Sequence, residues 1–191
     1  MRLDTAVSLA LLLLFRFGRR RSSHCYRARC RVGPHGKPCG DGQQDRCTGG
    51  QACSGIVTFE QIGSADCVIS WSLKNCGAPG LRGFHIHESA DFSQGCKSAG
   101  PHYNPYGRSH GGPQDTERHV GDLGNIVVAA DGTSSGRMTD RLVRLTGPTS
   151  VVGRSVMIHA AEDDLGRGGH ELSATTGNAG ERVACGEIVR C

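Results

Sequence analysis

Seven side chains of metal-binding type lie within 75 positions of this 191-residue chain, and they constrain what it can fold into more than any other feature. Six of the nine histidines belong to the set, together with one aspartate. The seven are His85, His87, His102, His110, His119, Asp122 and His159. Imidazole nitrogen suits copper and zinc, and a carboxylate among imidazoles suits zinc. Because seven donors are too many for one tetrahedral ion, the set predicts a binuclear copper/zinc site whose two ions share a ligand.

Alternating patterns predict strands that could carry such a site. Residues 55–61, 67–73 and 83–88 alternate apolar and polar side chains, and the last of these places His85 and His87 on one face. Further strands are expected at 119–129, 137–145, 151–159 and 183–189. The intervening segments 89–118 and 160–182 are rich in glycine and polar residues, which is typical of functional loops. The pattern predicts an all-β sandwich or barrel with its site on two long loops.

The N-terminal part differs from the rest in composition and charge. Residues 1–54 hold ten Lys/Arg and three Asp/Glu, a balance of +7, whereas residues 55–191 hold twelve and fifteen, a balance of −3. Residues 1–23 are expected to be a signal peptide or another leader, and 24–54 a Cys/Gly/Arg-rich segment without regular structure. A signal peptide predicts a secreted protein, with a cytoplasmic one as the alternative. The basic segment could bind a heparin-like polyanion or could be a solvated tail.

Ten cysteines also favour an oxidising compartment, because their number is even. None forms a C-x-x-C pair, so a cysteine-ligated zinc site is not expected. Their spacing leaves the connectivity open. No stretch reaches the roughly 20 apolar residues that a membrane-spanning helix needs, so no transmembrane span is expected.

Five segments together resemble one known family, the copper/zinc superoxide dismutases. They are Gly83-Phe-His-Ile-His-Glu88, Gly95-Cys-Lys-Ser-Ala-Gly-Pro-His-Tyr-Asn-Pro105, His110-Gly-Gly-Pro113, Arg118-His-Val-Gly-Asp-Leu-Gly-Asn125 and Gly177-Asn-Ala-Gly-Glu-Arg-Val-Ala-Cys-Gly186. The resemblance runs from about Gly55 to Ile188, so that residues 55–191 are expected to form one dismutase-like domain with a Greek-key β-sandwich or barrel fold.

The resemblance also implies a role for each matching position. The copper ligands would be His85, His87, His102 and His159, and the zinc ligands His102, His110, His119 and Asp122, with His102 bound to both ions. Asp163 matches a carboxylate that links histidines of the two sites, and Arg182 matches the arginine beside the copper. Cys96 and Cys185 match the family's disulfide.

The activity implied is that of an enzyme that converts superoxide to dioxygen and hydrogen peroxide. Copper redox cycling would transfer the electrons, with His102 as the zinc-supported bridging ligand and with His102 and Arg182 as catalytic residues. Two alternatives stay open: a non-catalytic copper/zinc-binding protein, and an extracellular matrix-binding protein with an inactive dismutase-like domain. Retention of all seven donors and of Arg182 favours the enzyme.

Three departures from the family pattern are visible. The family's first strand should fall near Asp41–Thr48, which lacks apolar alternation, so either that edge is open or another segment fills it. Glu187 and Arg190 stand at the usual homodimer contact, and since charges are depleted in interface cores, a monomer or a different pairing is expected. Leu172 and Thr175 occupy positions that are often charged in relatives, which predicts an altered attraction of superoxide.

Overall fold

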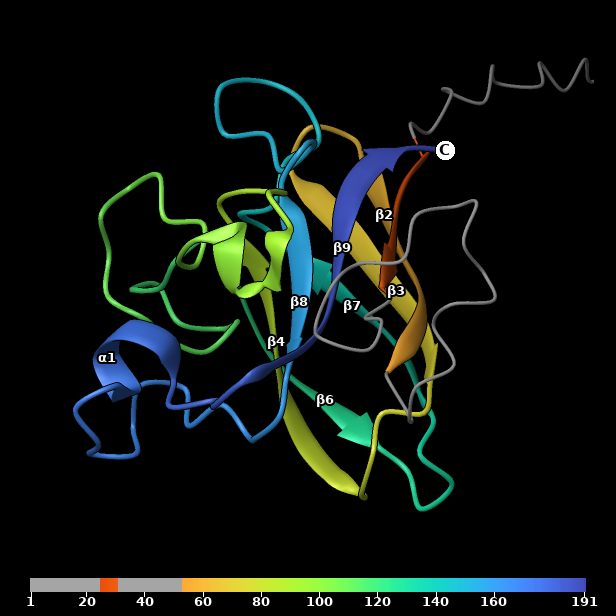
Figure 1. Ribbon diagram of the computed structural model, residues 1–191. Helices are drawn as coiled ribbons and strands as arrows, with labels where there is room; N and C mark the ends of the chain where they lie inside the picture. The colour runs from red at the N-terminus through yellow and green to blue at the C-terminus, as the bar shows by residue number, and fades with distance from the viewer. Residues whose placement is uncertain (1–24, 31–52) are drawn as a thin grey trace, which may run out of the picture.

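Nine strands dominate the computed structural model, which describes residues 25–30 and 53–191 (Figure 1). The elements are β1 (Cys25–Cys30), β2 (Ser54–Ile62), β3 (Asp66–Lys74), β4 (Gly80–His87), β5 (Ser93–Cys96), the 3₁₀ helix η2 (Lys97–Ala99), β6 (Asp122–Val128), β7 (Ser134–Asp140), β8 (Ser155–His159), α1 (Ser173–Thr176) and β9 (Arg182–Arg190). The predicted all-β fold is confirmed, and the predicted strands are present with ends shifted by a few residues. None of the described helices is long and apolar enough to cross a membrane.

The strands form two antiparallel sheets that share β9. Their order is β6-β4-β8-β9-β1-β2-β3-β7, and the two strands at the ends of this order, β6 and β7, also contact each other. Side chains alternate between the enclosed core and the outside, as the period of a strand requires. On β3, Cys67, Ile69 and Leu73 are buried, and Trp71 on the same face is partly buried against the core. The sheets therefore wrap around one apolar core.

The segment that takes the place of the missing first strand is β1. It pairs with β2 through Cys30 and Gly55 and with β9 through Ala28 and Ile188. The expectation of irregular structure was therefore wrong for Cys25–Cys30, where the alternation of Tyr26, Ala28 and Cys30 with two arginines is a strand signal that the surrounding composition obscured. The segment 41–48, where the family's first strand was expected, and the leader 1–23 lie outside the described residues.

Both long loops lie on the same side of the barrel, beside β4 and β8 (Figure 1). The first connects β4 to β6 and contains β5 and η2, and the second connects β8 to β9 and contains α1. A disulfide joins Cys96 at the end of β5 to Cys185 in β9, as the resemblance implied, and fastens the first loop to the sheet. A second disulfide, Cys53–Cys76, closes the open end of the β2–β3 hairpin.

Candidate metal centre

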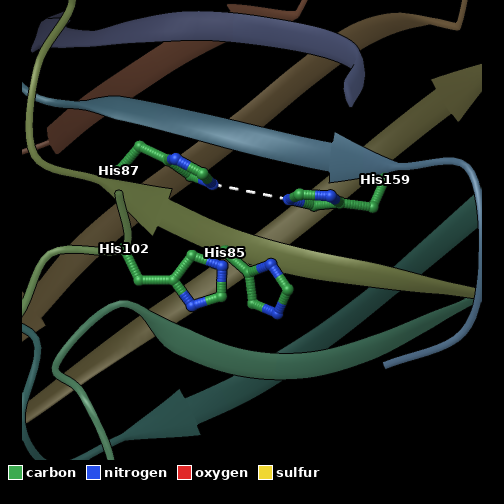
Figure 2. A group of neighbouring side chains, drawn as sticks. All are labelled: His85, His87, His102 and His159. Carbon is green, nitrogen blue, oxygen red and sulfur yellow. Dashed lines mark hydrogen bonds between the residues drawn. The ribbon is translucent and has the colours of Figure 1, made fainter. Parts of the chain in front are cut away.

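Two strands and one loop bring the first four histidines together (Figure 2). His85 and His87 come from β4, and His159 from the end of β8, which pairs with β4. The loop adds His102, whose backbone forms an isolated bridge with His87, while Tyr103 N–H donates to the carbonyl of Ile86 at 2.8 Å. One nitrogen from each of the four imidazoles lies within 4.8 Å of the others, and all four residues are buried. This group has the size and chemistry of a copper site.

Backbone carbonyls decide which nitrogen of two of these imidazoles faces the group. His87 Nδ1 lies 2.8 Å from the carbonyl oxygen of Gly100, and His159 Nδ1 lies 3.0 Å from that of Gly180, so each Nδ1 carries a proton and donates. The two Nε2 atoms, 3.4 Å apart, are left as lone-pair donors toward the centre (Figure 2). Burial lowers the pKa of His87 well below its usual range and that of His159 to about 4. Both rings are therefore neutral at physiological pH, as a metal ligand must be.

The second donor group surrounds Asp122 at the start of β6. Its Oδ1 atom lies 2.9 Å from Nδ1 of His102, 3.0 Å from Nδ1 of His110 and 3.0 Å from Nδ1 of His119. Donors of a tetrahedral zinc ion are about 3.3 Å apart, given bond lengths of roughly 2.0–2.1 Å. Three nitrogens and one carboxylate oxygen in a closed, buried group thus fit a structural zinc ion.

The pKa shifts of Asp122 and His110 show that the donor group around Asp122 favours a bound positive charge. Burial alone would raise the pKa of Asp122, but hydrogen bonds from three imidazoles lower it well below its usual range. Burial alone would lower the pKa of His110, but Asp122 and Asp163 outweigh burial and raise it to about 9. The anionic carboxylate stabilises positive charge on its partners, and a zinc ion would take the place of the ring protons.

His102 belongs to both groups. Its Nδ1 is on the Asp122 side, whereas its Nε2 is buried and has no hydrogen-bond partner within the described chain. The ring lies 4.0 Å from that of His85 and 4.9 Å from that of His87, measured between centroids. Nδ1 of His85 is likewise buried without a hydrogen bond from the described residues. Since buried polar atoms normally have partners, Nε2 of His102 and Nδ1 of His85 indicate ligand positions.

Asp163 connects the two donor groups by hydrogen bonds to one histidine of each, on the side of the ring opposite the nitrogen that is left for a metal. Its Oδ2 accepts a hydrogen bond from Nε2 of His85 at 2.8 Å, and its Oδ1 accepts one from Nε2 of His110, also at 2.8 Å. Both bonds leave the opposite nitrogen, Nδ1, for a metal. Gly177, with φ of +64°, closes over this carboxylate at a place where any Cβ atom would overlap it. The linking position that the resemblance gave to Asp163 therefore has the geometry it requires.

Arg182 lies at the edge of the four-histidine group that fits copper, and the first long loop holds its guanidinium. Its Nη1 donates to the carbonyls of Cys96 at 2.9 Å and Lys97 at 3.0 Å, and its Nη2 donates to that of Gly100 at 2.6 Å. The same Gly100 carbonyl accepts from His87, so the guanidinium is fixed relative to a candidate copper ligand. Among the described residues no carboxylate pairs with Arg182, and its positive charge remains available to an anion.

Known proteins match this chain over most of its length. Residues 53–188 match the family described as "Copper/zinc superoxide dismutase (SODC)". The chain belongs to the copper/zinc superoxide dismutases. The "Superoxide dismutase [Cu-Zn]" of Candida glabrata is 55% identical over 141 residues, which is 73% of this chain and 92% of the relative, and that of Kluyveromyces lactis is 54% identical over 141 residues, 73% and 91%. A solved structure described as "Crystal Structure Analysis of the clock protein EA4" superimposes with a TM-score of 0.75 at 35% identity, over 88% of this chain and 96% of that one.

Family membership establishes the activity and the metals. The protein is an oxidoreductase that converts superoxide to dioxygen and hydrogen peroxide with copper and zinc, as predicted. The two buried donor groups fit these metals, and neither alternative, a non-catalytic copper/zinc-binding protein or a matrix-binding protein with an inactive domain, is favoured.

Two supporting residues were missed by the sequence reasoning although both stand within a recognised segment. Arg118 donates to the carbonyls of His119 and Asp122 and forms a buried ion pair with Asp140. Asn125 exchanges two hydrogen bonds of 2.8 Å with the backbone of Asp163. Their place in the segment Arg118–Asn125 was a signal that they serve the site.

Proposed function

We propose that His85, His87, His102 and His159 bind the copper and that His102, His110, His119 and Asp122 bind the zinc of this superoxide dismutase. The observation that carries this assignment is the ring of His102, which presents Nδ1 to one buried donor group and an unpartnered Nε2 to the other. When bound, copper supplies one-electron oxidation and reduction of superoxide, and zinc supplies a redox-inert positive charge.

The protein's own residues then position the substrate and a proton. His102 keeps its orientation because Nδ1 belongs to the zinc group, and its Nε2 can carry a proton toward the substrate side. Peroxide formation consumes protons, so a proton held at this atom is placed where the reaction needs it. Asp163 fixes the rings of His85 and His110 by accepting their Nε2 protons. These contacts keep the rings of His85 and His110 oriented while a proton moves at Nε2 of His102.

Arg182 would orient the superoxide anion. Its guanidinium stays protonated at physiological pH although burial lowers its pKa. Three backbone carbonyls hold it without neutralising its charge, which supports an electrostatic role at the mouth of the copper group.

Replacement of the shared ligand tests the assignment. We expect His102→Ala to lose most superoxide consumption after reconstitution with both metals, because the variant lacks a ligand of each ion. His170→Ala is the matched control, since His170 is exposed and belongs to neither donor group. Wild-type-like turnover of His102→Ala, with full copper and zinc content by elemental analysis, would contradict the shared-ligand assignment.

We propose secretion, with cytoplasmic residence as the alternative outcome. Two disulfides between described residues, and the disulfide-bonded state of Cys191, are the supporting observations, because such bonds persist in oxidising compartments. Expression in a host cell followed by assay of medium and cell lysate distinguishes the two. Activity found in the lysate alone would argue for the cytoplasm.

Polyanion binding and a monomeric state complete the proposal. The surplus of +7 in residues 1–54 supports binding of heparin-like chains. Replacement of Arg31, Lys37 and Arg46, which lie after the expected leader 1–23, by Gln should lower the salt concentration of elution from heparin resin, and unchanged elution would oppose it. Exposed Glu187 and Arg190 on β9 support a monomer, which light scattering after size-exclusion chromatography would measure directly.

A further inference from the structure

The loop between β8 and β9 offers little attraction to an approaching anion. Residues 160–182 contain five acidic and two basic side chains, a balance of −3. One of the two bases, Arg167, is paired with Asp115 at 2.7 Å, which leaves Arg182 as its uncompensated cation. Leu172 and Thr175, both exposed around α1, are uncharged. Superoxide is an anion, so attraction to this face beyond that of Arg182 has to come from another segment.

The other loop brings a lysine beside Arg182. Nη1 of Arg182 donates to the backbone carbonyl of Lys97 at 3.0 Å, in the first residue of η2. Nη2 of the same guanidinium donates to Gly100, whose carbonyl also accepts from the candidate copper ligand His87. In Figure 1 the loop that contains η2 lies on the same side of the barrel as α1. Three hydrogen bonds, through Arg182 and Gly100, thus connect the backbone of Lys97 to the candidate copper ligand His87.

The charge of Lys97 is free to act at a distance. Its side chain is exposed, and no carboxylate of the described residues pairs with its ammonium group. The described residues contain one other lysine, Lys74, at the end of β3 and in the sheet that carries no candidate metal ligand. We propose that Lys97 is a second cation, beside Arg182, that draws superoxide to the copper group. The inference rests on the dismutase function and on the copper assignment above.

The size of the effect follows from one unit charge at the mouth of the site. At a separation of about 10 Å in water, removal of one positive charge lowers the local concentration of a monovalent anion by roughly twofold when screening is weak. Lys97→Gln should therefore lower kcat/KM by about twofold at an ionic strength of about 0.01 M, and Lys97→Glu by about fourfold. At about 0.5 M salt, where the screening length is a few ångströms, the variants and the wild type should converge.

The experiment measures superoxide consumption by the copper- and zinc-loaded protein at both salt concentrations, with metal contents verified. Lys74→Gln and Lys74→Glu carry the same changes of net charge and serve as matched controls. Lys97→Arg should behave like the wild type, because it keeps the charge. A second readout is the affinity of the copper-loaded protein for azide, followed in the visible spectrum, which Lys97→Gln should weaken about twofold at low salt.

Three results would overturn the inference. They are equal rates for Lys97→Gln and the wild type at low salt, equal losses in the Lys74 and Lys97 variants, and a loss in Lys97→Gln that persists at high salt. Failure of this inference is distinguishable from failure of the dismutase function. In the first case the wild type is active and the Lys97 variants do not show the salt-dependent loss, whereas in the second case the wild type itself is inactive. If the wild type were inactive, azide affinity would still decide whether Lys97 attracts anions.

Discussion

Removal of the Cys96–Cys185 disulfide should destabilise the protein more than removal of the Cys53–Cys76 disulfide. The first bond spans 89 residues and the second spans 23. A cross-link lowers the conformational entropy of the unfolded chain, and the effect grows with the logarithm of the closed loop. Two buried disulfides of very different loop length in one chain therefore allow a direct comparison.

The loop lengths set the magnitudes. The chain-entropy relation gives about 4.6 kcal/mol for the 89-residue loop and about 3.4 kcal/mol for the 23-residue loop, a difference of about 1.2 kcal/mol. For a protein of this size, loss of the longer link should lower Tm by roughly 10–20 °C. Activity should fall as well, because Cys96 is part of the turn whose carbonyls hold Arg182.

Paired substitutions avoid a leftover thiol. Cys96→Ser/Cys185→Ser and Cys53→Ser/Cys76→Ser should be compared by urea denaturation of metal-free protein, since bound metals add their own binding free energy to stability. Reduction of the remaining disulfides must be excluded by mass spectrometry. A free-energy loss for the shorter loop that equals or exceeds that for the longer loop would refute the entropic reasoning.

Three further predictions concern the site and the core. Asp163→Ala should weaken zinc binding by roughly 10–100-fold in competition with a chelator, because two imidazoles lose their common acceptor, whereas Asp164→Ala should leave it unchanged. Equal zinc affinities of Asp163→Ala and the wild type would show that Asp163 does not support the site. Burial lowers the pKa of His159 to about 4, below its unfolded value near 6.5. The free energy of unfolding of the metal-free protein should therefore be highest above pH 6.5 and fall as the pH falls toward 4, because the unfolded ring binds the proton more tightly. Urea titrations across this range should show the decline, and a flat profile would contradict it. Burial raises the pKa of the Cys67 thiol to about 12, so iodoacetamide at pH 8 should leave Cys67 unmodified in native protein and modify it after denaturation, as peptide mass spectrometry would show.

Much of the candidate site was predictable because the residues that form it stand in short segments with local signals. His85 and His87 share a strand face as the two-residue period requires, and His102, His110 and His119 of the first long loop were singled out from their flanking residues. The strand near the N-terminus was not found. Its alternation of Tyr26 and Ala28 with arginines is short and weak, and its stability comes from ladders with β2 and β9 that no local pattern specifies.

The sequence by itself determined the kinds of ligand, their order and the all-β framework, because side-chain chemistry and strand period are local properties. Only the tertiary structure decided which nitrogen of His85, His87 and His159 faces the candidate copper position. That choice depends on acceptors from distant segments, namely the carbonyls of Gly100 and Gly180 and the carboxylate of Asp163. The place of Lys97 beside Arg182 was decided in the same way, since 85 positions separate the two residues and hydrogen bonds across the loops bring them together.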